Sequence, residues 1–236
     1  MQCKLCLKEK TLCNSHIIPE FFYKPVYDEK HRLRVVPLSS EERERFEQKG
    51  IREYLLCEDC EMQISKYEDH VKRVFYGGTG ISIKRGNPII IGGIDYNKFK
   101  LFQLSLIWRA SISKAAFFNA VQLGPHEEQI RNMIIREDSG SWLKYPCSII
   151  MMLMDGKEIL DAFIYPPQLF RYKGHFAYRF IFGGCFWVFF ISSHTREIEI
   201  KNFFLTEDGK ISIPIKKAED TPFFQEVARS IYKYNK

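Results

Sequence analysis

Two pairs of cysteines near the N-terminus constrain the fold of this chain more than any other feature of its sequence. Cys3 and Cys6 form one Cys-x2-Cys pair, and Cys57 and Cys60 form the second. Each pair can present two thiolates from one tight turn, and two such pairs supply the four ligands of a tetrahedral structural Zn²⁺ site. The spacing therefore predicts that a zinc ion joins two segments that lie far apart in the sequence.

Other arrangements of these cysteines stay open from the sequence. The two pairs could remain reduced without meeting, and Cys13 with His16 has a Cys-x2-His spacing that would suit a mixed ligand set. A metal is favoured because residues 1–76 contain a charged insert, Ser39–Gly50, which we expect to be a solvated helix or loop. Such a segment offers little core, and zinc binding would supply the folding free energy that packing does not.

The composition is that of a globular protein, with 45% hydrophobic and 27% charged residues in a chain of 236. The chain begins MQCKLC without an apolar stretch, so we expect a cytoplasmic protein rather than a secreted one. The apolar run Phe180–Ile191 is too short to span a membrane, and Gly183 and Gly184 divide it. We therefore expect a β-hairpin there and no membrane partner.

The pattern along the chain predicts an α+β protein in two parts. Residues 1–76 are expected to form a zinc module that ends in a helix over Glu61–Phe75, where apolar residues recur at three- and four-residue steps. Residues 77–236 are expected to form a second α+β domain with an antiparallel sheet, one long helix from Asp95 to about Gln122 and a closing helix from about Pro222 to Tyr234. The expected strands are 81–84, 89–93, 147–154, 162–165, 175–182, 185–192, 197–205 and 211–215.

A histidine motif follows the first cysteine pair. His16 lies in the run SHIIP, the charged insert comes next, and the run YLLC then leads into the second cysteine pair and a helix. This order resembles the zinc-stabilised branch of the HNH, or His-Me finger, endonucleases, over residues 1–76. The residues that carry the resemblance are Cys3, Cys6, His16, Ile17, Ile18, Pro19, Leu55, Leu56, Cys57 and Cys60.

The resemblance implies a treble-clef core of the ββα-metal type and assigns roles to particular residues. His16 would be the general base that deprotonates a water, and a neutral imidazole near pH 7 suits that task. Glu61 stands where the family commonly has a metal-ligating histidine, and its carboxylate suits Mg²⁺ or Mn²⁺. Glu68 follows two helical turns later on the same face, so it would reach the same site.

Two positions depart from the family pattern. The acidic ligand expected before the histidine is Ser15, and the asparagine expected before the second cysteine pair is Arg52, which could grip a phosphate. Outside the motif, His70 could replace a missing ligand, and Arg109 beside Trp108 could contact a nucleic acid or a partner. The simpler alternative is that Trp108 packs in the core and that the charged side chains are solvated.

The sequence therefore supports functions of more than one class. The first is an HNH-like, metal-dependent endonuclease that cleaves nucleic acid, with DNA as the expected substrate. A wider similarity to HNH-like proteins of bacterial mobile elements and phage-defence loci would place it in bacterial defence. The alternative is a zinc-binding module that has lost catalysis and binds nucleic acid or a protein partner. A third interpretation is a zinc-stabilised interaction subunit of a larger complex. The positive net charge of +6, which lies wholly beyond residue 76, is compatible with a nucleic-acid partner.

Overall fold

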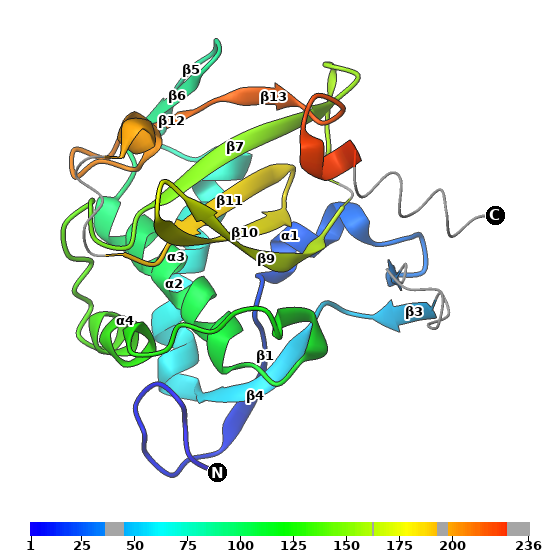
Figure 1. The fold of residues 1–236 in the computed structure, drawn as a ribbon. Coiled ribbons are helices and arrows are strands. Elements are labelled where there is room, and N and C mark those ends of the chain that lie inside the picture. Colours follow the sequence, from blue (N-terminus) through cyan, green and yellow to red (C-terminus); the bar gives the residue numbers. More distant parts are fainter. Residues whose placement is uncertain (36–44, 162, 193–197, 226–236) are drawn as a thin grey trace.

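Antiparallel strands and two long helices build most of the chain in the computed structural model, which describes residues 1–35, 45–161, 163–192 and 198–225 (Figure 1). The N-terminal part contains the strands β1 (Leu12–His16), β2 (Arg32–Val35), β3 (Arg45–Gln48) and β4 (Arg52–Cys57) and the helices α1 (Glu20–Tyr23) and α2 (Glu58–Tyr76). The later elements are β5 (Ser82–Lys84), β6 (Ile89–Gly92), α3 (Tyr96–Ile112), α4 (His126–Ile135), β7 (Cys147–Met154), β8 (Glu158–Ile159), β9 (Tyr165–Tyr172), β10 (His175–Phe182), β11 (Cys185–Phe190), β12 (Ile211–Ile213) and β13 (Ile215–Lys217). Short 3₁₀ helices cover Lys24–Val26, Ala116–Phe118 and Glu199–Phe203.

The candidate site is built on a unit of two strands and one helix. Strand β1 pairs antiparallel with β4, so that His16 lies opposite Arg52, and helix α2 begins directly after β4. The first turn of α2 contains Glu58, Asp59 and Glu61. Their negative charges stabilise the helix because they lie near the positive end of its dipole. The order of this unit is strand, strand, helix, and its treble-clef type stays a prediction.

The largest sheet has the order β13-β7-β11-β10-β9, with β8 paired to β7. All of its strand pairs are antiparallel except β13 with β7. Gly183 and Gly184 join β10 to β11 with φ angles of +58° and +71°, as a two-residue hairpin turn of the primed type requires. The α+β class, the antiparallel sheet and the hairpin are thus confirmed, and no helix in the described ranges is long and apolar enough to cross a membrane.

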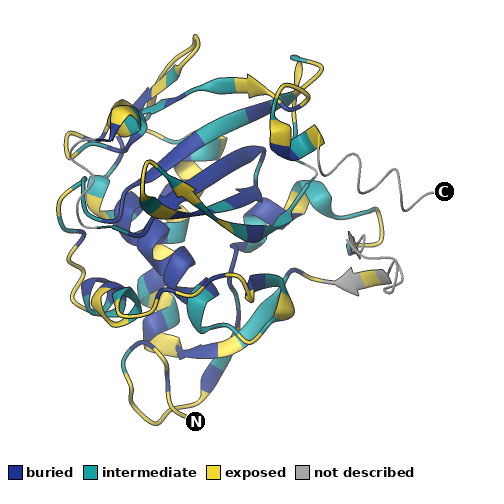
Figure 2. Ribbon diagram, in the orientation of Figure 1, coloured by how far each residue is buried: buried dark blue, intermediate teal, exposed yellow. Residues whose placement is uncertain are grey.

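One continuous core joins the N-terminal residues to the rest of the chain (Figure 2). Twelve residues of α3 are buried, on all sides of the helix, because α2 covers one side and the sheet and α4 cover others. Phe22 on α1 and Phe75 on α2 both pack against Trp187 on β11, with ring centroids 6.0 and 5.4 Å from it. The division at residue 76 stays a prediction, and apolar packing is continuous across it.

Several expected elements differ in the structure. The long helix ends at Ile112 instead of near Gln122, because Ser113 is extended and donates a hydrogen bond to Glu53 at 2.7 Å. The segment expected as a strand over 197–205 is a 3₁₀ helix at Glu199–Phe203, where burial of Ile198 and Phe204 overrides its alternating pattern.

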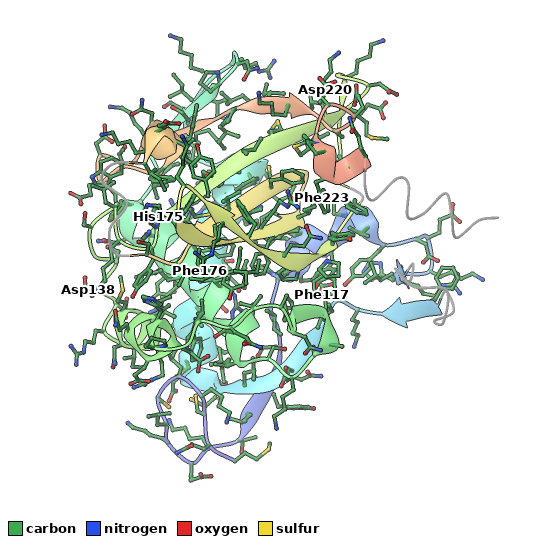
Figure 3. All side chains as sticks on the ribbon, in the orientation of Figure 1. Phe117, Asp138, His175, Phe176, Asp220 and Phe223 are labelled. Carbon is green, nitrogen blue, oxygen red and sulfur yellow. The ribbon has the colours of Figure 1, made fainter. Side chains whose placement is uncertain are left out.

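The charged insert and the C-terminal segment also differ from expectation. Residues 45–48 form strand β3, paired with β2, and residues 39–44 lie outside the described ranges. Pro214 divides the expected strand 211–215 into β12 and β13, which join different sheets. The closing helix begins at Pro222, and its part beyond residue 225 is not described. Phe223 in this turn packs on the sheet beside Arg179, whose Cζ lies 4.1 Å from the ring centroid (Figure 3).

Alanine substitution of two turn glycines tests the hairpin packing. Gly183→Ala should destabilise the fold by about 2–4 kcal/mol, because its left-handed backbone disfavours a side chain and the new Cβ would overlap the ring of Phe22. Gly174→Ala is the matched control, with φ +85° and nothing within 4 Å of its Cβ, and should lose only about 1–2 kcal/mol. Urea unfolding of both variants measures the difference, and equal losses would contradict the packing of Phe22 under this turn.

Candidate functional site

The four N-terminal cysteines converge as the sequence predicts. The Sγ atoms of Cys3, Cys6, Cys57 and Cys60 all lie within 4.8 Å of one another, and those of Cys6 and Cys57 are 3.8 Å apart. A tetrahedral zinc site with Zn–S bonds of about 2.3 Å places its sulfurs about 3.8 Å apart, whereas a disulfide bond is about 2.0 Å long. The donor set and spacing therefore fit a four-thiolate metal site, such as one for zinc.

Hydrogen bonds donated by backbone N–H groups of the two cysteine segments explain why the two pairs meet. The Lys4 backbone N–H donates to the Leu55 carbonyl at 2.9 Å, and the Cys57 N–H donates to Cys3 Sγ at 3.3 Å. Cys3, Cys57 and Cys60 are buried. Burial raises the pKa of the Cys60 thiol above its ordinary value, so a nearby cation is needed to favour the thiolate.

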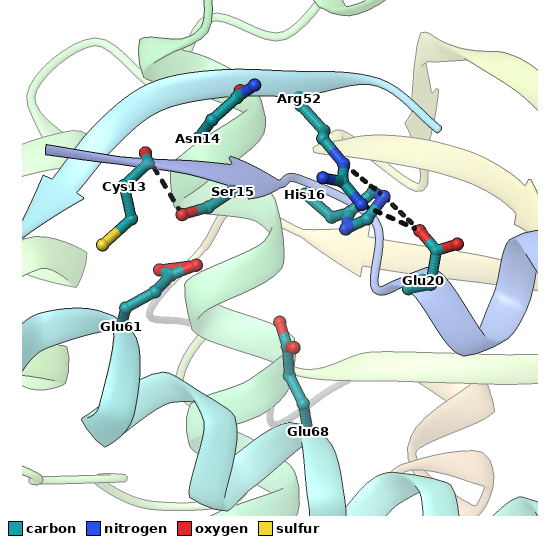
Figure 4. A pocket seen from close by; sticks show the side chains of 8 residues that line it. All are labelled: Cys13, Asn14, Ser15, His16, Glu20, Arg52, Glu61 and Glu68. Carbon is teal, nitrogen blue, oxygen red and sulfur yellow. Dashed lines mark hydrogen bonds and ion pairs between the residues drawn. The ribbon is translucent and has the colours of Figure 1, made fainter. Parts of the chain in front are cut away.

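Cys13 lies apart from this cluster. Its side chain lines a second site, a cavity of about 320 Å³ between β1, α1, β4 and α2 (Figure 4). The described residues thus contain no mixed ligand set of the Cys-x2-His type at the thiol cluster. The residues that line the cavity are Cys13, Asn14, Ser15, His16, Glu20, Arg52, Glu61 and Glu68.

All four residues that we expected at a catalytic or phosphate-binding site line this cavity. His16 and Arg52 lie opposite each other on β1 and β4, and Glu61 and Glu68 project from the same face of α2 (Figure 4). The spacing of seven residues is two helical turns, which brings both carboxylates to the same side. What the sequence could not predict is how each of these side chains is held.

The His16 imidazole is mostly buried, with 13% of its side chain exposed. Burial lowers its pKa to about 4, with the positive charges of Arg52 and Arg109 acting in the same direction and Glu20 opposing them. Arg52 Nε donates a hydrogen bond to His16 Nε2 at 2.9 Å, and a carboxylate oxygen of Glu20 closely contacts the same nitrogen. The imidazole is therefore neutral at pH 7.

The two carboxylates on α2 differ in their partners. Glu68 Oε1 accepts a hydrogen bond from Arg109 Nη2 at 2.7 Å, and burial raises the pKa of Glu68 while Arg109 opposes this shift. Oε2 of Glu61 is buried and has no hydrogen-bond partner within the described residues. A buried oxygen without a donor is costly, so Glu61 is the carboxylate of the cavity that most needs a cation or a proton donor.

Arg109 contacts this site in a way that the sequence did not indicate. It is 1% exposed, although it lies on α3 in the second half of the chain. Its Nη1 donates to the His16 carbonyl at 2.8 Å and its Nη2 donates to Glu68. One guanidinium therefore contacts both strand β1 and helix α2. We expected a possible contact with nucleic acid, and the burial of Arg109 excludes this for the structure as described.

Glu20 is the other residue that sequence reasoning missed. It follows His16 by four residues, and the only available signal was this spacing across Pro19. His70 and Trp108, in contrast, have structural roles: His70 Nε2 accepts a hydrogen bond from the Asp95 N–H at 3.0 Å, and Trp108 is buried. His70 is therefore engaged away from the cavity.

The cavity combines excess negative charge with a neutral base. Glu20, Glu61 and Glu68 outnumber the cations Arg52 and Arg109 that contact them. An anionic substrate would be repelled unless a divalent cation joined the carboxylates. Among the described residues, only the four cysteines bring three or more potential metal-ligating atoms of His, Cys, Asp or Glu within 4.8 Å of one another. The carboxylates would therefore have to close around a cation.

Metal analysis of cysteine variants tests the thiol cluster. The purified protein should contain about one zinc per chain, and Cys57→Ser should lose the metal and much of its thermal stability, because one ligand of a closed site is gone. Cys13→Ser is the matched control and should retain the metal. Elemental analysis with thermal unfolding gives both readouts; a metal content that depended equally on Cys13 would contradict the four-cysteine assignment.

Removal of the Arg109 guanidinium tests the link between the two halves. Arg109→Met should destabilise the fold by about 3 kcal/mol, near the lower end for a broken buried pair because 21% of the Glu68 side chain is exposed. With Glu68→Gln already present, the same substitution should cost about 1–2 kcal/mol less, since no charge is stranded. A double-mutant cycle in urea measures this coupling, and strictly additive losses would argue against the pair.

Comparisons of the chain with protein-family models, with curated proteins and with solved structures gave no match. The function therefore has to be argued from the geometry and charge of the cavity and from the thiol cluster beside it.

Proposed function

We propose that this chain is a metal-dependent phosphodiesterase of the HNH-like type, which cleaves nucleic acid, with DNA as its substrate. The observation that carries the proposal is one cavity in which a neutral imidazole on a strand lies across from two carboxylates on a helix. The thiol cluster supports it, because a zinc ion there would fix the end of β4 at the start of that helix. The treble-clef type of the core is part of this proposal.

His16 acts as the general base. Its pKa of about 4 keeps the ring unprotonated at neutral pH, so its lone pair is free to accept a proton from a water molecule in the cavity. A pKa this low also makes the imidazole a weak base, so a bound cation would have to acidify that water. The resulting hydroxide attacks phosphorus, the bond from phosphorus to the leaving oxygen breaks, and that oxygen takes up a proton from solvent water. The imidazolium then returns its proton to solvent, which balances the step.

Glu61 and Glu68 would hold a divalent cation, Mg²⁺ or Mn²⁺. The buried, unpartnered Oε2 of Glu61 and the local excess of carboxylates fit such an ion, which prefers oxygen ligands. The ion would supply positive charge for the scissile phosphate and the departing oxygen. Arg109 keeps Glu68 oriented toward the cavity from behind.

Arg52 binds the substrate phosphate. Its side chain is 29% exposed and its Nη2 lies 3.6 Å from Glu20, a loose contact that a phosphate could replace with a bidentate one. This role would compensate for part of the cost of bringing an anion into an acidic cavity.

The alternative function is a zinc-stabilised module that binds nucleic acid or protein without catalysis. One observation favours it: His16 and the carboxylates are not gathered as tightly as the thiols are, so the described residues offer no preassembled cation site in the cavity. Such a module would bind DNA with an affinity that falls steeply with salt, and it would not cleave it.

Plasmid cleavage tests the proposal. With Mg²⁺ or Mn²⁺ the protein should nick supercoiled DNA, and His16→Ala should lower the rate by about 10²–10⁴-fold, as expected for loss of a general base. His175→Ala, on β10 outside the cavity, is the control and should cleave normally (Figure 3). Because only neutral His16 accepts a proton, the rate should stay level from pH 7 to pH 6 and fall toward pH 4.

The outcomes separate the functions. Cleavage that survives in His16→Ala would remove His16 from the role of base. If the protein binds DNA in a salt-sensitive way but does not cleave it with any divalent metal present, the alternative function is favoured.

A further inference from the structure

We propose that Glu20 is a positioning residue that holds the His16 imidazole in the tautomer protonated at Nε2, which leaves Nδ1 as the atom that accepts the proton. The tautomer is a property of the folded chain alone. The use of Nδ1 in cleavage rests on the proposed function.

Glu20 is well placed and fixed for this role. It lies at the start of α1, four residues after His16, and its Oε2 forms the close contact with Nε2 of the ring. Its other oxygen, Oε1, accepts a hydrogen bond from the Tyr27 hydroxyl at 3.0 Å. That hydroxyl accepts a hydrogen bond in turn from the Gly50 N–H at 2.8 Å, so the carboxylate is held from both sides.

Two groups compete for the same ring nitrogen. Arg52 Nε–H is directed at His16 Nε2 at 2.9 Å, while the Glu20 carboxylate contacts the same atom. In a neutral imidazole each nitrogen either donates or accepts, so Nε2 cannot satisfy both partners at once. The tautomer therefore decides which partner is engaged.

The buried Oε2 atom of Glu20 decides the competition. It accepts no further hydrogen bond in the described part of the chain, so a proton on Nε2 is what satisfies it. The Glu20 side chain as a whole is 37% exposed and that of Arg52 is 29% exposed, but Arg52 has further donors, and its Nη2 already lies 3.6 Å from Oε2. Leaving a buried carboxylate oxygen unpaired costs more than leaving a partly exposed guanidinium to solvent.

The consequence concerns the other ring nitrogen. The two nitrogens of imidazole point in different directions, so an Nε2 that faces Glu20 directs the lone pair of Nδ1 away from it. No hydrogen bond to Nδ1 is present within the described residues, and the ring lines the cavity together with the carboxylates of α2 (Figure 4). A water in the cavity can therefore lose its proton to Nδ1 without displacing Glu20 or Arg52.

The charges around the ring set the direction of the pH effect. Burial lowers the His16 pKa most, the cations also lower it, and Glu20 raises it. Loss of the Glu20 charge should therefore lower the pKa below about 4. The charged groups that face the ring or line its cavity are Glu20 on α1, Arg52 on β4, Arg109 on α3, and Glu61 and Glu68 on α2.

Nitrogen-15 NMR of the imidazole, recorded on the full chain without substrate at pH 7, reads the tautomer directly. The His16 signals are assigned by their absence in His16→Ala. We expect the Nε2–H tautomer in the wild type. In Glu20→Ala we expect a shift to the Nδ1–H tautomer, because Arg52 then donates to Nε2. In Glu20→Gln we expect the original tautomer, since the amide oxygen still accepts, with a lower His16 pKa.

Cleavage assays on the same samples separate positioning from folding. Glu20→Ala should slow plasmid cleavage by about 10–100-fold, as for other residues that orient a histidine. Glu20→Gln should recover most of that loss near pH 7. Glu29→Ala, an exposed glutamate in the same segment, is the control for both readouts and should match the wild type.

The two proposals fail in different ways. An Nδ1–H tautomer in the wild type, or a tautomer unchanged in Glu20→Ala, overturns the role of Glu20 whether or not the protein cleaves DNA. A tautomer that shifts in Glu20→Ala while cleavage stays unchanged overturns the use of Nδ1 as the proton acceptor. Absence of cleavage in the wild type overturns the proposed function, and the NMR result then still decides the tautomer.

Discussion

The convergence of four thiols is the constraint on which the rest of the structure depends. Cys3 and Cys6 precede β1, and Cys57 and Cys60 end β4 and open α2, so the cluster sets both strands and the helix in one place. Without a cation, four thiols, three of them buried, are a poor substitute for a core, because they contribute neither charge pairing nor much apolar area. The position of His16 relative to Glu61 and Glu68 thus depends on how the nearby thiol cluster is held together.

A second constraint comes from the other half of the chain. The Arg109 guanidinium is buried, and its two contacts, with the His16 carbonyl and with Glu68, reach the two elements that face each other across the cavity. A buried charge is tolerated only when it is paired and hydrogen-bonded, so each of these partners depends on the others. Helix α3 therefore has a direct part in the site, which gives residues beyond 76 a role beside the core they share.

The charged side chains of the cavity do not form separate one-to-one pairs. Glu20 is shared between His16, Arg52 and Tyr27, while Glu61 has an oxygen with no donor among the described residues. A buried oxygen without a hydrogen-bond donor, next to a base with a lowered pKa, is typical of sites where a ligand or a reacting group supplies the missing partner. This unequal satisfaction makes the cavity, rather than the rest of the surface, the centre of the proposed function.

The sequence by itself determined the elements whose signal is local. The cysteine spacing indicated the thiol cluster, the seven-residue spacing put Glu61 and Glu68 on one helix face, and Gly183 with Gly184 marked a hairpin. Only the tertiary structure decided the contacts of Glu20 and Arg109, the end of α3 at Ile112 and the 3₁₀ turn at Glu199–Phe203. The physical reason is that these depend on burial and on partners distant in sequence, which no local pattern encodes.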